Sequence, residues 1–313
     1  MSTGASTGAS TLAAGIDWSQ IFNYSDYGAL LSLIQNTLIA GAVLGLVGGL
    51  VSVFVIMRDL PFAVHGISEL SFAGASGALL FGVSVAGGAI AGSLVAALVI
   101  GAMGSRARDR NTVIGVLMPF GLGLGVLFLS LYQGRAANKF GLLTGQIVSI
   151  DFSQLNTLIV TSVIVVAGLV LVWRPLTFAS SDPDLAAARG VRVGVLSVVF
   201  MLLLGLTVAL SVQIVGALLV LSILVTPGAA AVRVTASPLL VVVLSVVFAE
   251  VALVGGILLA NGSSVPISPY ITTISFTIYL VCRAVGALRH RRGWAARRGD
   301  PASDSVPAGP VSA

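Results

Sequence analysis

Long uninterrupted apolar runs are the feature that most restricts what this chain can fold into. Each run has roughly 20 residues, enough for an α-helix to cross the hydrocarbon core of a bilayer. Because lipid cannot pair with backbone polar groups, continuous runs of this length predict helices rather than the short, alternating strands of a barrel. The runs fall near residues 29–56, 61–82, 84–104, 112–132, 154–174, 193–212, 213–234, 238–260 and 270–288.

The composition supports the same fold class. Of the 313 residues, 57% are hydrophobic and only 9% are charged, which is typical of an integral membrane protein. We therefore predict an all-α, polytopic transmembrane helix bundle with about nine spans, within a range of eight to ten. The least certain boundary lies near Gln213, where two spans joined by a tight turn and a re-entrant pair both fit.

The ends of the chain differ from its middle. Residues 1–27 carry no Lys or Arg and are rich in small polar residues, so we expect a flexible tail and no cleaved signal peptide. Residues 28–290 form the predicted transmembrane domain, and residues 291–313 read as a disordered C-terminal tail. The arginines lie mainly at the ends of apolar runs, which indicates topology in a bacterial plasma (inner) membrane and not nucleic-acid binding.

Two ionisable residues stand together in the second apolar run. His65 and Glu69 are four residues apart, so on a helix they share a face and can reach one cation together. Imidazole and carboxylate suit zinc, manganese or iron, but two ligands from one helix cannot enclose an ion. The alternative is that the two side chains only bond each other or a neighbouring helix.

A second carboxylate, Glu250, lies inside a later apolar run without a local partner. Buried charges in membranes are costly and usually mark a site or a pathway. Glu250 can contact the ion, pair across helices or relay a proton. We count it as a candidate metal ligand beside His65 and Glu69.

The chain lacks the motifs of an enzyme. Its only lysine, Lys139, is not in a phosphate-binding loop, and no nucleophile elbow or zinc-protease motif occurs. We therefore expect no catalytic activity and no cofactor in this chain. Any ATP would be hydrolysed by a partner.

Over about residues 30–288 the sequence resembles the ABC-3 family, the permease subunits of zinc, manganese and iron ABC importers. Family members show an arginine followed by G-D-A-x-S-H and P-G; here Arg58 precedes V-H-G-I-S-E, and Ser68 and Gly74 match. His65 occupies the acidic position and Glu69 the histidine position, so the two ligand types are exchanged. A later stretch, Q-I-V-G-A-L-L from Gln213, is similar to the family's Q-x-V-G-x-L-L.

The segment at 182–191 resembles the family's D-P-E-x-A-x-x-x-G stretch, which the resemblance identifies as the helix that docks in the ATPase. Its residue types also predict a short capped helix, and an ordinary loop helix is the alternative. The coupling residues carried over are Asp182, Pro183, Asp184, Ala188 and Gly190.

The resemblance implies a homodimeric permease that imports a divalent metal ion, with zinc slightly favoured over manganese or iron. It also implies a cytoplasmic ATP-binding subunit and an extracellular metal-binding lipoprotein as partners. Three other functions remain open: a siderophore or vitamin permease of related architecture, a proton-coupled secondary transporter, and a membrane scaffold or receptor.

Overall fold

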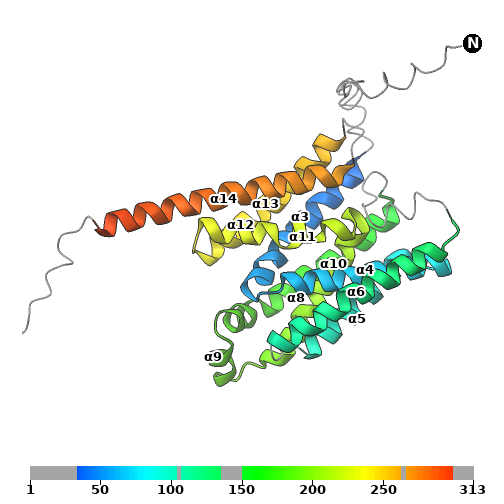
Figure 1. Cartoon of the computed structure of the whole chain (residues 1–313), viewed down its shortest axis with the longest axis horizontal. Helices are drawn as coiled ribbons and strands as arrows, with labels where there is room; N and C mark the ends of the chain where they lie inside the picture. Colours follow the sequence, from blue (N-terminus) through cyan, green and yellow to red (C-terminus); the bar gives the residue numbers. More distant parts are fainter. Residues whose placement is uncertain (1–33, 104–106, 135–149, 262–265, 299–313) are drawn as a thin grey trace, which may run out of the picture.

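The computed structural model describes residues 34–103, 107–134, 150–261 and 266–298, and within them every regular element is a helix. Helices follow one another along the chain, and most connections within the described ranges are short (Figure 1). They are α3 (Gln35–Met57), α4 (Pro61–Phe81), α5 (Val85–Met103), α6 (Ala107–Leu131), α8 (Phe152–Ser181), α9 (Pro183–Ala188), α10 (Val193–Val215), η2 (Ala217–Leu219), α11 (Val220–Leu224), α12 (Thr226–Val234), α13 (Pro238–Ala260) and α14 (Ile267–Arg298).

The predicted all-α membrane fold is confirmed. Seven of the described helices are long and apolar enough to cross a membrane: α3, α5, α6, α8, α10, α13 and α14. Helix α4 has 21 residues and packs beside α5 and α6, but it is not among these seven, since His65 and Glu69 together with its serines and glycines lower its hydropathy. The apolar segment Val220–Val234 is shorter than a span.

The chain around Gln213 forms one intact helix followed by a broken segment. Helix α10 continues through Gln213 to Val215, and the chain turns at Gly216, whose φ of 86° favours glycine. The segment beyond is interrupted again at Val225, just before Pro227. The Ser52 hydroxyl of α3 accepts a hydrogen bond from the Gly228 amide at 2.9 Å, which fixes this second break against α3.

Close helix packing depends on glycine at several crossings. In the α4–α5 contact, a Cβ on Gly92 would overlap the Leu70 carbonyl, and Gly74 faces Gly88 in the same way. Between α3 and α13, a Cβ on Gly49 would lie 2.6 Å from the Cα of Val246. The glycines spaced four apart in the sequence therefore let backbones approach, as small residues do in membrane bundles.

The helices fall into two packed groups (Figure 1). Helix α4 packs mainly against α5 and α6, with α10 next to them. Helix α3 packs against α13 and α12, and both of these contact α14. The short α11 connects the groups, because it touches α4, α3 and α14.

The domain boundaries stay largely a prediction. Helix α14 runs to Arg298, past the boundary that the sequence indicated at residue 290. The predicted tail at 1–27 and residues 299–313 lie outside the described residues.

Candidate functional site

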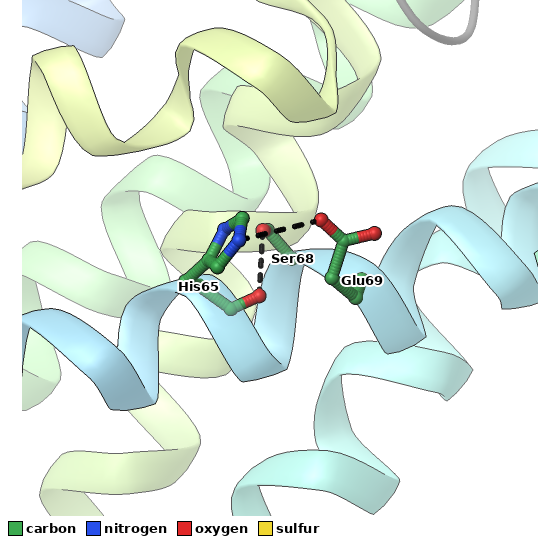
Figure 2. Close-up of polar contacts among 3 residues, drawn as sticks. All are labelled: His65, Ser68 and Glu69. Atoms are coloured by element: carbon green, nitrogen blue, oxygen red, sulfur yellow. Dashed lines mark hydrogen bonds and ion pairs between the residues drawn. The ribbon is translucent and has the colours of Figure 1, made fainter. Parts of the chain in front are cut away.

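Helix α4 carries the predicted pair. Its first residue is Pro61, which needs no hydrogen-bond partner at a helix start, and the helix then continues unbroken through His65 and Glu69. His65 Nε2 lies 3.7 Å from Glu69 Oε1, and Figure 2 shows both side chains on the same side of α4. The His65 side chain is 33% exposed and the Glu69 side chain only 8%. The predicted shared face is therefore present.

The pair is incompletely satisfied. His65 Nδ1 and Glu69 Oε2 are buried and have no hydrogen-bond partner among the described residues. Ser68, between them, donates its hydroxyl to the His65 carbonyl at 2.8 Å and so does not serve either side chain (Figure 2). Unpaired buried polar atoms are costly, which indicates that a ligand, water or another chain completes the group.

One wall of the pair is closed by tight backbone packing. A Cβ on Gly121 of α6 would lie 2.9 Å from the Glu69 carbonyl carbon, and Gly66 sits against Ile114 of α6. The partly exposed His65 leaves the other side open. The described residues contain no group of three or more His, Cys, Asp or Glu that could hold an ion. The pair on α4 therefore has two such side chains and no third beside them among the described residues.

Glu250 is not brought to this pair. It lies on α13, which packs against α3, α12 and α14, and its carboxyl group sits on Gly45 of α3. A Cβ on Gly45 would be 2.9 Å from Glu250 Cδ, so glycine makes room for the carboxylate. A role for Glu250 in ion binding or proton transfer stays a prediction.

The predicted coupling segment forms a separate short helix, α9, at one end of the bundle (Figure 1). The Asp182 side chain caps it by accepting from the Leu185 amide at 2.9 Å, and Pro183 takes the first position. Gly190 ends it with φ of 83°, and the next amide, of Val191, donates back to the Ala186 carbonyl at 3.0 Å. Asp184 stands in the first turn and Ala188 is the last helical residue.

One connection was missed by the sequence analysis. The Arg58 guanidinium, between α3 and α4, donates to the Ser180 hydroxyl near the end of α8 at 3.4 Å. Its carbon also lies 5.7 Å from the ring centroid of Phe200 on α10. Arg58 thus connects the start of α4, which carries His65 and Glu69, to Ser180, two residues before Asp182. The only signal in the sequence was that an arginine, Arg58, stands six residues before the V-H-G-I-S-E motif.

These features define a class of protein: a multi-pass helical membrane protein with a polar His–Glu pair inside the bundle and a short capped helix at one end. The particular family follows from comparison. The chain belongs to the ABC 3 transport family, whose model matches residues 31–286.

Individual relatives agree with this assignment. The chain is 28% identical over 227 residues to the manganese transport system membrane protein MntC of Halalkalibacterium halodurans, covering 72% of this chain and 78% of the relative. It is 23% identical over 253 residues to the high-affinity zinc uptake system membrane protein ZnuB of Haemophilus influenzae, covering 80% and 97%. The solved structure of PsaBC from Streptococcus pneumoniae in complex with Fab superposes with a TM-score of 0.73 at 25% identity, covering 82% and 94%.

Proposed function

We propose that this chain is the membrane-spanning permease of an ABC importer for manganese or zinc ions, and that His65 and Glu69 are transient ligands on the ion's path. The observation that carries this proposal is that His65 Nδ1 and Glu69 Oε2 have no hydrogen-bond partner in the described part of a chain of the ABC 3 transport family. An incomplete shell suits transport because the ion must bind and then leave.

The partners follow from what one chain lacks. Two ligands per copy suggest that a second copy completes the shell across a homodimer, with the ion passing between the copies. A separate cytoplasmic ATPase would dock on α9, and an extracellular lipoprotein would deliver the ion. The bacterial inner membrane is the proposed location.

The choice of ion rests on ligand chemistry and relatives. Imidazole favours zinc and carboxylate favours manganese, so the pair serves both. The relatives are named for manganese transport and for zinc uptake. The slight preference for zinc in the sequence interpretation therefore gains no support from the site.

Cellular metal content tests this function. A deletion strain grown at limiting metal should contain less manganese or less zinc by mass spectrometry, and the wild-type gene should restore it. The His65→Ala/Glu69→Ala variant should not restore it. No deficit in any metal, with the chain expressed and other importers deleted, would contradict the proposal.

A further inference from the structure

An apolar cavity of about 510 Å³ lies where several helices end. Its walls come from the end of α3, the later part of α8, the end of α12 and the start of α13. Met57, the last residue of α3, and Pro238, the first residue of α13, both line it. Each of these two helices has 23 residues, enough to cross a bilayer once. The cavity therefore lies where two spans reach a membrane surface.

The lining of the cavity suits hydrocarbon. Ten of its twelve lining residues are apolar, and the other two are Thr177 and Thr235. The Thr177 hydroxyl donates to the Trp173 carbonyl at 2.8 Å, and the Thr235 hydroxyl accepts from the Ser237 amide at 3.2 Å. No lining residue has a buried side-chain polar atom without a partner in the described part of the chain. Water in the cavity would therefore find few hydrogen-bond partners.

The cavity runs from the surface of the bundle toward its core. Leu239 and Val232 are 73% and 41% exposed, whereas Val53 and Phe54 are buried. Trp173 packs edge-on against Phe54, with the ring centroids 4.9 Å apart. Tryptophan is enriched where helices meet a membrane surface, because its ring is apolar and its N–H group is polar. An acyl chain can therefore enter at the exposed end and pack against the buried one.

Two arginines adjoin the walls of the cavity. Arg174 follows Trp173 on α8, and Arg233 follows Val232 on α12. Both arginines are exposed, and neither forms an ion pair among the described residues. Their positive charges are therefore available to a ligand.

A third arginine, Arg289 of α14, is fixed beside the same cavity. Its guanidinium donates to the Val234 carbonyl at 2.8 Å, and Val234 directly precedes Thr235 in the cavity wall. The backbones of α12 and α14 are close here, since a Cβ on Gly286 would lie 2.6 Å from the Arg233 carbonyl oxygen. A guanidinium has five N–H donors, so the exposed Arg289 side chain can also bind an anion.

The charges around the cavity are mainly positive. Within two positions of a lining residue the chain has one acid, Asp59, and three arginines, Arg58, Arg174 and Arg233. Arg58 is already engaged with α8 and α10. A second cavity, of about 550 Å³ between α11–α12 and α14, has no charged residue within two positions of its lining. The basic surroundings are thus particular to the first cavity.

We propose that this cavity binds an anionic phospholipid, with an acyl chain among the apolar residues and the phosphate held by Arg174, Arg233 and Arg289. A phospholipid matches both the hydrocarbon lining and the cations beside it. Arginine binds phosphate through paired N–H groups, and basic clusters at a membrane surface attract anionic headgroups. The volume of about 510 Å³ is ordinary for a small-molecule pocket. This site does not depend on which ion the chain moves.

Quenching of Trp173 by brominated lipid tests the site. In a Trp18→Phe/Trp294→Phe background, Trp173 is the chain's only tryptophan, and it lines the cavity. The full chain is placed in nanodiscs of mixed phosphatidylglycerol and phosphatidylcholine, with the acyl chains of one lipid brominated. From the dependence of quenching on mole fraction, phosphatidylglycerol should bind beside Trp173 at least about fivefold more strongly than phosphatidylcholine.

The arginines are tested in the same background. Arg174→Gln/Arg289→Gln should bring the two lipids to within about twofold of equal binding, because both replaced side chains are then neutral. Arg283→Gln is the matched control, since Arg283 is an exposed arginine on the same helix as Arg289 and adjoins no lining residue. It should keep the full preference.

Two further variants separate a site from ordinary contact with lipid. Leu171→Trp, with Trp173→Phe, reports ordinary contact, because Leu171 is 82% exposed on the same helix as Trp173. It should show no preference between the lipids. Ala236→Phe adds a ring to an exposed lining residue and should remove about half or more of the quenching of Trp173, because the ring takes up space that the acyl chain needs.

Three results would overturn the site. The first is equal binding of the two lipids beside Trp173, or a preference that survives Arg174→Gln/Arg289→Gln. The second is the same preference at Leu171→Trp, which would show general enrichment at the protein surface. The third is no quenching of Trp173 by either lipid, which would show that protein covers the cavity. Because no transport is measured, a failure of the import function would leave these results unchanged.

Discussion

The loop helix α9 and the His65–Glu69 pair on α4 are built in opposite ways. In α9 both ends are satisfied: Asp182 caps the first turn, and the chain after Gly190 bonds back to the last turn. On α4, His65 and Glu69 touch each other and leave one buried polar atom each without a partner in the described chain. A helix capped at both ends resists deformation, whereas a pair with unsatisfied polar atoms is stabilised when a ligand binds to it.

That difference suggests a division of labour. On the proposed function, α9 would transmit force from the ATPase and would need to stay rigid, while the His65–Glu69 pair would bind and release the ion. Arg58 lies between them, since it joins the start of α4 to Ser180 at the end of α8. Four variants, one of them a double substitution, should separate the two regions, and ion uptake per ATP hydrolysed by the assembled transporter is the common measurement.

The largest effect is expected when His65 and Glu69 are replaced. His65→Ala/Glu69→Ala should lower uptake at least 50-fold, on the order of the loss seen when metal-site residues are removed, because each copy then offers the ion neither side-chain ligand. The yield of folded protein and the basal ATPase rate should stay near wild type. An equal loss of folded protein would show instead that the pair serves packing.

The next largest effect is expected at the end of α9. Gly190→Val places a branched side chain at φ of 83°, which costs about 1–2 kcal/mol, so coupling should fall roughly tenfold. Ion affinity should not change. Gly194→Val is the control, because Gly194 has open space around it and no positive φ. Equal effects of the two substitutions would contradict a special role for Gly190.

A smaller effect is expected at the start of α9. Asp182→Ala removes the bond to the Leu185 amide, which is worth about 1 kcal/mol, so uptake per ATP should fall about fivefold. Asp182→Asn can still accept this bond and should restore most of the coupling. If Asn were as poor as Ala, the charge of Asp182 and not its capping bond would matter.

The smallest effect is expected at the connection between the regions. Ser180→Ala removes the acceptor of the Arg58 guanidinium and should lower coupling about twofold, in line with a net hydrogen-bond contribution of about 0.5 kcal/mol. Ser181→Ala is the matched control, since that hydroxyl bonds only within its own helix. Identical uptake in both variants would show that the bond between Arg58 and Ser180 takes no part in coupling.

Much of this was visible in the sequence because membrane helices follow simple rules. Most apolar runs predicted helices, but the run at 213–234 is not a span, because α10 continues through Gln213 to Val215 and the segment Val220–Val234 is too short. The i, i+4 spacing predicted the contact between His65 and Glu69. The residue types at Asp182 and Gly190 predicted both ends of α9. Each of these features is local, so the spacing along the chain was sufficient.

Contacts between distant segments were not visible. The hydrogen bond of Arg58 to Ser180 spans 122 positions, and the break at Val225 depends on Ser52, far away in α3. The separation of Glu250 from His65 and Glu69 likewise follows from the packing of α13 against α3 and of α4 against α5 and α6, which hydropathy does not show.

The most direct test of the central claim is Mn²⁺ and Zn²⁺ uptake by the reconstituted Glu69→Gln transporter. Glutamine keeps the size of Glu69 and can still bond the His65 imidazole, but it is a neutral and weaker ligand. If Glu69 binds the ion, uptake should fall at least tenfold while assembly and basal ATP hydrolysis stay unchanged. Uptake equal to wild type would show that the pair only holds the bundle together.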